Sequence, residues 1–294
     1  MNVKLIDSNY DFEIVGASYI GKPCDNTFMF ASRKVEALVS NLKTANNCLV
    51  FLENGIAVDD ELKNSHCFVF SDNPQLEYSR FSLLFAKEKE DTYLAKKYIE
   101  KNHIIYGEDV SIGNGTIIEP GCFIDHGVVI GNNCRIKAKS VIRNCTIGDN
   151  VLVNENALIG ANGFNMAEDE DGNKMRIPTL GRVVIGDNCE IGAFDNISAG
   201  SGGDTVLENN VKIDALVHIG HDVFLHKNVE ITAGSVIGGF VEIEEHGYVG
   251  IHSVLRNRIK IGKNAFVGMG AVVTKSVDDG VTVVGNPAKP FERK

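Results

Sequence analysis

From about residue 103 onward, an aliphatic residue returns at every sixth position of this chain. The series contains 24 aliphatic residues, with a one-residue slip after the sixth and interruptions after the ninth and the twelfth. Its members are Ile112, Ile118, Ile124, Ile130, Ile136, Ile142, Ile147, Val153, Ile159, Ile185, Ile191, Ile197, Leu207, Ile213, Ile219, Leu225, Ile231, Ile237, Ile243, Val249, Leu255, Ile261, Val267 and Val273. A fixed short period held this long predicts a solenoid, in which each repeat is stable only when it is stacked on its neighbours.

The residue four places after each of these aliphatics is usually small or β-branched. Successive side chains of a strand point to opposite faces, so these two positions share one face of a short strand and both point inward. Gly, Asn and Asp between them supply the corners, as in IGDN at 147–150 and 185–188. Cys122, Cys134 and Cys189 occupy the small inward position. They are therefore predicted to be wall residues rather than ligands or redox groups.

Repeats of the form aliphatic–Gly–x–x–small–x resemble those of the hexapeptide acyltransferases. This resemblance implies a left-handed parallel β-helix with three hexads in each coil, so that 24 hexads make about eight coils. Ordinary crossover rules favour the opposite hand, so the left-handed sense comes from the family alone. The long interruption at 160–184 is expected to be an excursion loop that leaves the solenoid. The shorter interruption at 198–206 adds residues one coil before a group of histidines, and each loop is expected either to be solvated or to touch substrate.

Residues 1–102 lack the six-residue period and alternate between apolar runs and segments with helical spacing, which predicts a small α/β domain. Strands are expected at 12–17, 27–31, 48–53 and 67–71, and helices at 34–43, 74–88 and 91–101. The last of these helices is expected to connect the small domain to the solenoid at 103–284. A short tail at 285–294 closes the chain.

The composition excludes several classes of protein. A net charge of -10 disfavours nucleic acid and anionic membrane surfaces as partners. No apolar run is long enough to span a bilayer, and the first residues lack the pattern of a secretion signal, so no membrane insertion is expected. The seven cysteines are odd in number and lack paired short spacings, which argues against a disulfide framework or a zinc ribbon. A reduced, cytoplasmic enzyme or binding protein is predicted.

The segment VHIGHDVFLH at 217–226 contains three histidines, for which metal binding and base catalysis are the two readings. The five-residue separation of His221 and His226 resembles that of two zinc ligands in the γ-class carbonic anhydrases. A catalytic zinc site needs a third protein ligand, and Ile185 stands where that family has it. No metal is therefore expected. His218, His226, His246 and His252 are expected to be surface or corner residues of the solenoid.

The segment DALVHIGHDV at 214–223 resembles two families of N-acyltransferases, those of lipid A synthesis and those that acetylate nucleotide-linked 4-amino sugars. In both families the histidine that matches His221 is the general base, and an imidazole is suited to take the proton that an amine loses as it attacks a thioester. The resemblance implies that the N–H of Gly239, one coil above, stabilises the oxyanion. It also implies that Asp222 orients the imidazole, although a neighbouring strand residue tends to point the other way. His221 itself is expected to be exposed at a corner.

The order of a small α/β domain followed by a β-helix resembles the UDP-3-O-(3-hydroxyacyl)glucosamine N-acyltransferases of lipid A synthesis, as does DNPQLEYSRF at 72–81. That resemblance implies that Phe30 and Asp214 contact the nucleotide sugar. The chain departs from the family where Arg33 and Glu36 replace Asn and Tyr, and where Arg258 replaces a second histidine.

The GNPAK segment near the end of the chain resembles acetyl-CoA-dependent hexapeptide enzymes. This resemblance implies acyl-CoA, most simply acetyl-CoA, as the co-substrate, with Lys275 and Lys289 near its phosphates and Ile251, Gly268 and Gly239 along its thiol-bearing arm. The family places this groove between neighbouring solenoids, so a homotrimer is expected.

The predicted function is an acyl-CoA-dependent N-acyltransferase that acts on a nucleotide-linked amino sugar for a bacterial surface glycan. Three alternatives stay open: a lipid A N-acyltransferase that uses an acyl carrier protein, a metalloenzyme of the carbonic anhydrase kind, and a scaffold without catalytic activity.

Overall fold

The structure is a computed structural model that describes residues 1–291, with the side chains of residues 89, 91 and 92 not described. The last three residues of the expected tail, 292–294, lie outside the described residues. The chain divides into two compact units. The first contains Met1–Ala95, Phe164–Gly181 and Ser201–Gly203, and the second contains Lys96–Gly163, Arg182–Gly200 and Asp204–Lys294.

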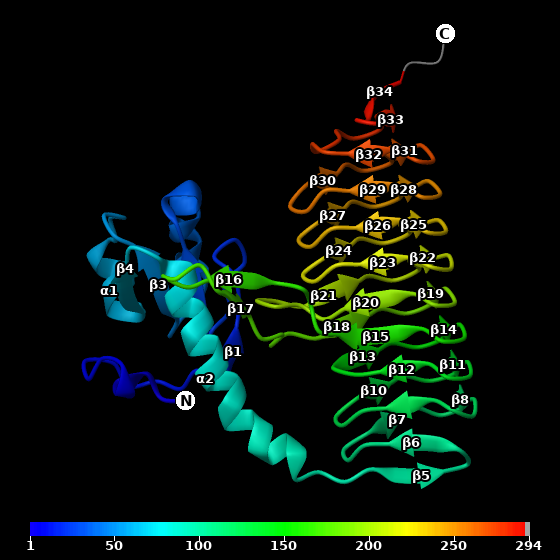
Figure 1. The fold of residues 1–294 in the computed structure, drawn as a ribbon, viewed down its shortest axis with the longest axis horizontal. Helices are drawn as coiled ribbons and strands as arrows, with labels where there is room; N and C mark the ends of the chain where they lie inside the picture. Colours follow the sequence, from blue (N-terminus) through cyan, green and yellow to red (C-terminus); the bar gives the residue numbers. More distant parts are fainter. Residues whose placement is uncertain (292–294) are drawn as a thin grey trace. The chain divides into compact units, whose positions relative to one another are not determined.

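The second unit is a three-faced solenoid whose strands pair in parallel, except for the antiparallel pairs β5–β6 and β33–β34 at its two ends (Figure 1). We name each face after one of its strands. The β23 face contains β5 (Ile99–Lys101), β6 (Ile104–Tyr106), β9 (Phe123–Ile124), β12 (Val141–Ile142), β15 (Leu158–Ala161), β20 (Asn196–Ser198), β23 (His218–Ile219), β26 (Val236–Ile237), β29 (Val254–Leu255) and β32 (Val272–Val273). The β24 face contains β7 (Ser111–Ile112), β10 (Val129–Ile130), β13 (Cys145–Ile147), β18 (Val183–Ile185), β21 (Thr205–Leu207), β24 (Phe224–Leu225), β27 (Glu242–Ile243) and β30 (Lys260–Ile261). The β22 face contains β8 (Ile117–Ile118), β11 (Arg135–Ile136), β14 (Leu152–Val153), β19 (Glu190–Ile191), β22 (Lys212–Ile213), β25 (Glu230–Ile231), β28 (Tyr248–Val249), β31 (Phe266–Val267), β33 (Thr282–Val284) and β34 (Lys289–Pro290).

The six-residue period predicted these strands correctly, because each of the 24 aliphatic positions lies in one of them. Partners one coil apart pair in parallel, as Ile219 does with Ile237. Almost all of the aliphatics are buried in one continuous core, together with the small residues between them. Ile112 is an exception at 40% exposure, since it belongs to the first complete coil and has fewer neighbours below it. Cys122 is buried in the wall, as predicted, and all seven cysteines are free thiols.

Three corners separate the faces, and we name them after residues of one coil. The Asp214 corner joins β22 to β23, the His221 corner joins β23 to β24, and the His226 corner joins β24 to β25. Many corner residues have a left-handed backbone, for example Asn150 with φ 57° and Asn188 with φ 59°. Asn tolerates this conformation better than other side chains do, which is why the IGDN segments form corners.

The first unit has a parallel four-stranded sheet in the order β1 (Gly16–Ala17), β2 (Thr27–Ala31), β3 (Leu49–Glu53), β4 (Cys67–Ser71). It also contains α1 (Asp60–Ser65), the 3-10 helices η1 (Val3–Leu5) and η2 (Arg33–Thr44), α2 (Pro74–Leu94), and the antiparallel hairpin of β16 (Met166–Glu168) and β17 (Lys174–Arg176).

The strands and helices expected in this region are present with three corrections. The strand expected at 12–17 is reduced to β1, Gly16–Ala17. The helix expected at 34–43 is a 3-10 helix with a kink at Val35. The connecting helix expected at 91–101 ends at Leu94, and Ile99–Lys101 forms β5 in the second unit because it pairs with β6. The expected boundary at residue 102 therefore differs from the division in the structure, where Lys96 already belongs to the solenoid unit.

The excursion loop contributes its own strands and buried side chains to the first unit. Ala167 and Ile177 join an apolar cluster that is built around Phe28 and Tyr78. The loop is therefore a packed part of that unit rather than a solvated extension. No helix among residues 1–291 is long and apolar enough to cross a membrane.

Candidate active site

The His221 corner is a tight turn between β23 and β24. Its third residue, Asp222, has a left-handed backbone with φ 57°, and its N–H donates to Thr205 Oγ1 at 2.9 Å. The turn takes both side chains out of the strand alternation, so neighbours in sequence can face one another. The Asp222 Oδ2 lies 2.7 Å from the His221 Nδ1, and the Asp222 side chain is 2% exposed. The structure thus brings together the two residues whose relative orientation the sequence left open.

This contact has a chemical consequence. A buried carboxylate beside Nδ1 favours the tautomer in which Nδ1 carries the proton, because a carboxylate accepts hydrogen bonds and does not donate them. The other ring nitrogen, Nε2, is then left as the basic atom. The pair has the arrangement that orients imidazoles in general-base sites.

His221 is less exposed than the sequence suggested. Its side chain is 14% exposed, and the prediction of an exposed corner residue is therefore wrong. One reason is Gly163, whose backbone lies so close that an added Cβ would be 2.9 Å from the His221 Cβ. Gly163 is the last residue of the solenoid unit before the excursion, and the path of such a loop cannot be inferred from a repeat pattern. The edge of the Phe240 ring also meets the imidazole, with ring centroids 5.1 Å apart.

Gly239 lies one coil above His221, as predicted. A Cβ added to Gly239 would be 2.9 Å from the His221 Nε2, so the absence of a side chain keeps this nitrogen accessible. Within residues 1–291, the Gly239 N–H has no hydrogen-bond acceptor, whereas the next N–H along, that of Phe240, donates to the His221 carbonyl at 3.0 Å. A basic nitrogen and an unused backbone N–H are therefore adjacent, which is the pairing that acyl transfer requires.

Phe240 and Arg258 extend the site, since they lie one and two coils above the His221 turn. Phe240 has φ 60°, the left-handed conformation that recurs at the corners of this solenoid, as at Phe194 and Leu216. The Arg258 Cζ lies 4.0 Å from the centroid of the Phe240 ring, so the guanidinium stacks on its face. Arg258 thus occupies the place of the family's second histidine but interacts with the aromatic ring instead.

Three of the predicted site residues lie on the opposite edge of the β23 face, at the Asp214 corner. Asp214 lines a surface cavity of about 440 Å³ whose other walls include Glu190, Lys212 and Glu230. Ile251 is 45% exposed at the same corner. Gly268 also lies there, but an added Cβ would be 2.7 Å from a methyl carbon of Val284, so the last turn of the chain covers it. Within one chain these residues are not brought to His221.

The remaining predicted residues are dispersed. Lys275 is exposed on the His221 corner, and Lys289 is exposed in β34 at the end of the solenoid. Phe30 belongs to the first unit, where its ring packs 5.1 Å from that of Tyr78 and is half-buried.

One buried ionisable residue escaped the sequence analysis. Asp195 is 1% exposed and occupies an inward wall position, where its carboxylate accepts the N–H groups of Gly192 and Val217 at 2.7 and 2.8 Å. Burial raises the pKa of Asp195 to about 7, and the nearby Asp214 adds to the increase. The signal was present, since Asp195 is four residues after Ile191, at a position that the repeat reserves for small side chains.

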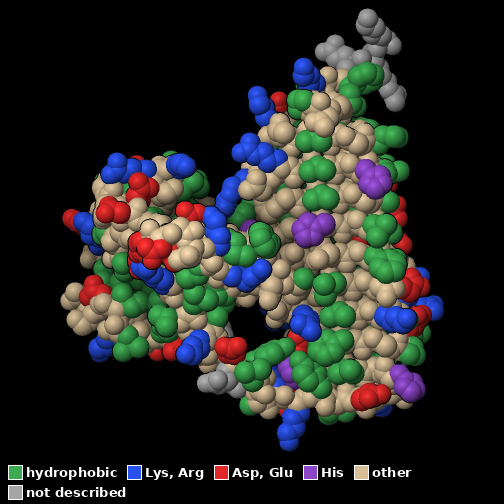
Figure 2. Space-filling model, in the orientation of Figure 1, with side chains coloured by type: hydrophobic (Ala, Val, Ile, Leu, Met, Phe, Trp, Pro, Cys, Tyr) green, Lys and Arg blue, Asp and Glu red, His purple; other side chains and the backbone are tan. Residues whose placement is uncertain are grey.

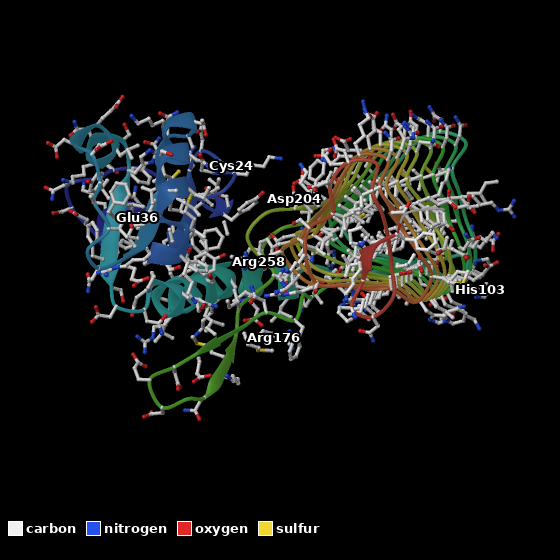
Figure 3. All side chains as sticks on the ribbon, turned by 90° about the horizontal axis from the view of Figure 1, so that it is seen from above. Cys24, Glu36, His103, Arg176, Asp204 and Arg258 are labelled. Atoms are coloured by element: carbon white, nitrogen blue, oxygen red, sulfur yellow. The ribbon has the colours of Figure 1, made fainter. Side chains whose placement is uncertain are left out.

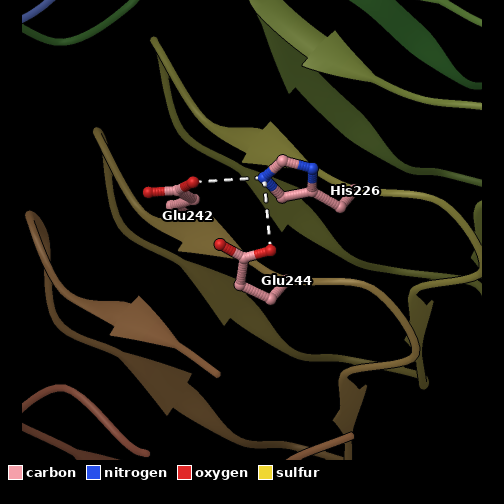
Figure 4. A group of neighbouring side chains, drawn as sticks. All are labelled: His226, Glu242 and Glu244. Atoms are coloured by element: carbon pink, nitrogen blue, oxygen red, sulfur yellow. Dashed lines mark hydrogen bonds and ion pairs between the residues drawn. The ribbon is translucent and has the colours of Figure 1, made fainter. Parts of the chain in front are cut away.

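The second histidine of the metal hypothesis has partners of its own. His226 Nε2 lies 3.1 Å from a carboxylate oxygen of Glu242 and 3.7 Å from one of Glu244 (Figure 4). Among the described residues, these three form the one group with the composition and spacing for a metal ion. The Lys260 ammonium forms ion pairs with both carboxylates, so a cation already offsets part of their negative charge. His221 takes no part in this group.

Comparisons with known proteins agree with this architecture. The model of the family "Bacterial transferase hexapeptide (six repeats)" matches residues 109–144 and 204–239. The hexapeptide repeats are confirmed. UDP-3-O-acylglucosamine N-acyltransferase of Coxiella burnetii is 39% identical over 120 residues, which is 40% of this chain and 35% of the relative. The enzyme of the same name from Caulobacter vibrioides is 49% identical over 160 residues, which is 54% of this chain and 47% of the relative. The chain thus spans between about a third and a half of the length of these relatives.

Solved structures support the fold. UDP-N-acetylglucosamine acyltransferase from Francisella novicida superimposes with a TM-score of 0.60 at 28% identity, over 65% of this chain and 69% of that one. The enzyme of the same name from Campylobacter jejuni gives a TM-score of 0.59 at 24% identity, over 65% and 73% of the two chains. The predicted left-handed parallel β-helix of about eight coils is confirmed, and so is the resemblance to acyltransferases of this type.

Proposed function

We propose that this hexapeptide-repeat protein is an N-acyltransferase that transfers an acyl group from a thioester to the amine of a nucleotide-linked amino sugar. The observation that carries the proposal is the juxtaposition of His221 Nε2 with the backbone of Gly239. The buried Asp222 carboxylate at 2.7 Å supports a basic role for the imidazole.

The proposed reaction uses two groups of the site. The amine nitrogen attacks the thioester carbonyl, a C–N bond forms, and His221 Nε2 takes the proton that the amine loses. The carbonyl oxygen becomes an oxyanion, which accepts a hydrogen bond from the Gly239 N–H. When the tetrahedral intermediate collapses, the C–S bond breaks and the thiolate takes the proton back from the imidazolium. Asp222 is a positioning residue that holds the ring through both proton transfers.

The acceptor is assigned by analogy with the relatives, whose names describe acylation of UDP-3-O-acylglucosamine. In our proposal Phe30 and Asp214 contact this nucleotide sugar. The replacements at Arg33 and Glu36 lie beside Phe30 in sequence and are consistent with a base or sugar that differs from that of the relatives.

For the donor we propose a short acyl-CoA, on the basis of the GNPAK segment. The names of the relatives, which give UDP-3-O-acylglucosamine as the acceptor, favour the second candidate, a lipid A N-acyltransferase. The resemblance to that family implies an acyl carrier protein as the donor. Both donors carry the acyl chain on the same kind of thioester, so the mechanism at His221 is common to them.

We further propose a homotrimer in which the β23 face is the interface. The outward residues Val236 and Val254 of this face are 39% and 40% exposed, and hydrophobic side chains follow the strands of the face in the space-filling view (Figure 2). By contrast, the outward residues of the β22 face include Arg135, Glu190 and Lys212. A cyclic assembly would let the Asp214 corner of one subunit meet the His221 corner of the next, because the two corners border the same face.

Product formation tests the proposal. Purified protein is incubated with UDP-linked amino sugars and one of two donors, either acetyl-CoA or an acyl carrier protein loaded with acyl chains of different lengths. The N-acylated sugar is detected by mass spectrometry. Product with acetyl-CoA is expected. Product with acyl carrier protein alone would replace the proposed donor, and no product with either donor from a folded protein would favour the scaffold reading.

A further inference from the structure

A single peptide group links the proposed base, His221, to the carboxylate residue Asp222. Its carbonyl, that of His221, accepts the Phe240 N–H at 3.0 Å from the coil above. Its N–H, that of Asp222, donates to the Thr205 Oγ1 at 2.9 Å in the coil below. The peptide from which both side chains leave is therefore held on two sides.

The lower of these two hydrogen bonds differs from its counterparts in the coils above. There the N–H of the left-handed corner residue donates to a backbone carbonyl one coil below. Phe240 donates in this way to His221, and Arg258 to Gly239, each at 3.0 Å. Asp222 stands at the same place in its own coil but donates to a side-chain hydroxyl.

A break in the solenoid accounts for this difference. The regular donor and acceptor are nineteen positions apart, and the same count back from Asp222 reaches Gly203, which belongs to the first unit. The solenoid resumes with Asp204, which lies at the same edge of the stacked coils as Arg258 in the view from above (Figure 3). Thr205 is the first inward residue after the break, and its hydroxyl takes the role that a carbonyl has in the coils above.

Thr205 also differs from the wall residues on which it is stacked. Strand pairing on the β24 face puts it in one inward column with Val183 below and Val223 above. The other positions of this column between residues 128 and 259 are apolar, and they are Val128, Cys145, Val183, Val223, Val241 and Ile259. Thr205 is 0% exposed, and a buried hydroxyl is costly unless it is hydrogen-bonded. Valine has nearly the same shape without that cost, so the wall itself does not require the hydroxyl.

We propose that Thr205 is a positioning residue for acyl transfer, which fixes the peptide between His221 and Asp222 so that the carboxylate meets Nδ1. The inference rests on the proposed function, in which His221 is the base. The distance of 2.7 Å between the Asp222 Oδ2 and the His221 Nδ1 depends on the left-handed turn that this peptide begins. Without the hydroxyl the turn relaxes, and a displacement of about an ångström in a catalytic group lowers a rate by roughly 10²-fold. Thr205 acts through Asp222 rather than on the substrate.

The test compares Thr205→Val, which removes the hydroxyl and keeps the shape, with Thr205→Ser, which retains the hydroxyl. Thr116→Val is the matched control. The Thr116 Oγ1 also accepts an N–H from the coil above, that of Cys134 at 3.0 Å, but it lies beside β8 on the β22 face. We expect kcat of Thr205→Val to fall roughly 10- to 100-fold, with KM for donor and acceptor unchanged. Thr205→Ser and Thr116→Val should keep kcat close to that of the parent.

Nitrogen-15 NMR of the histidine rings gives a readout that needs no substrate. The two neutral tautomers of an imidazole differ in their nitrogen shifts, and the signals of His221 are identified by their loss in His221→Ala. The parent is expected to carry the proton on Nδ1, and Thr205→Val is expected to show a mixture of the two tautomers. A purely structural role of Thr205 in the wall would leave the tautomer unchanged.

Parental kcat together with an unchanged tautomer in Thr205→Val would overturn the proposal, and so would an equal loss of kcat in Thr116→Val. If circular dichroism shows that Thr205→Val does not fold, Thr205→Cys takes its place, since Cys145 occupies this column in a lower coil. Absence of acyl transfer in the parent protein would count against the proposed function instead, and the tautomer of His221 in Thr205→Val would then decide the role of Thr205.

Discussion

The backbone of Gly239 lies so close to the imidazole of His221 that a methyl group on the glycine would be 2.9 Å from Nε2. The two residues are eighteen positions apart in sequence, and the pairing of β23 with β26 brings them together. The proposed chemistry depends on this contact, because it places the base and the oxyanion donor within reach of the same reacting thioester.

Gly239→Val is expected to lower kcat by roughly 10²- to 10³-fold, the loss seen when an oxyanion donor becomes unusable. The side chain would occupy the space beside Nε2 that the thioester carbonyl needs. Gly16→Val is a control elsewhere in the chain, because an added Cβ at Gly16 meets no atom within 4 Å. Steady-state rates together with circular dichroism check the prediction. A Gly239→Val enzyme with parental kcat would show that the carbonyl binds elsewhere.

Asp222→Asn tests the positioning of the imidazole. The amide has the size of the carboxylate but offers an NH2 group as well as an oxygen, so the tautomer with a basic Nε2 is no longer enforced. We expect kcat to fall roughly 10- to 10³-fold with KM little changed, since the effect acts through His221. Asp222→Ala should be at least as damaging. Equal activity of the parent and both variants would leave the carboxylate with a structural role in the corner.

The buried Asp195 predicts a pH dependence of stability. Its pKa is about 7 in the folded protein because of burial, against about 3.9 for an unfolded chain. The folded state therefore binds more protons between these values, and the stability that this group contributes below about pH 4 is lost as the pH rises through 7. Urea unfolding at pH 5 and pH 8 should show a larger loss of stability for the parent than for Asp195→Asn. The same loss in both proteins would mean that Asp195 titrates normally.

Assembly can be tested by placing a charge on the proposed interface. Val236→Asp introduces a carboxylate into the β23 face, and burying it in a trimer would be costly, so the variant is expected to dissociate. Phe266→Asp is the matched control, because Phe266 is also an exposed apolar residue but lies on the β22 face. Light scattering coupled to size exclusion gives the mass of each species. A parent protein that is monomeric at micromolar concentration, or a Phe266→Asp protein that dissociates instead, would contradict the assignment of the interface.

The sequence predicted the solenoid in detail because the repeat is a local property. Each aliphatic and each small residue reports one wall position, and the register of eighteen residues then follows, including the placement of Gly239 over His221. The orientation of Asp222 could not be read from the pattern, because it depends on a left-handed turn that overrides strand alternation. The burial of His221 was missed for another reason: Gly163 lies at the start of an irregular loop, whose path no period describes.

Arg258 illustrates the opposite case. The replacement of the family's second histidine by Arg258 was visible in the sequence, but its meaning was not. The stacking of its guanidinium on the Phe240 ring is a property of the folded corner. It requires the side chains of two neighbouring coils to be placed together, which a one-dimensional pattern does not give.

The central claim is that His221 alone among the clustered histidines acts as the base, and three single variants test it most directly. His221→Ala, His226→Ala and His218→Ala are assayed with saturating donor and acceptor. His221→Ala is expected to lower kcat by roughly 10²- to 10⁴-fold with the fold intact, the usual contribution of a positioned general base. His226→Ala and His218→Ala should retain most activity. His226 is engaged with Glu242 and Glu244, and the residue one coil above His218 is Val236 rather than a glycine. If His226→Ala is as damaging as His221→Ala, the single-base mechanism is contradicted and a metal or a pair of histidines must perform the chemistry.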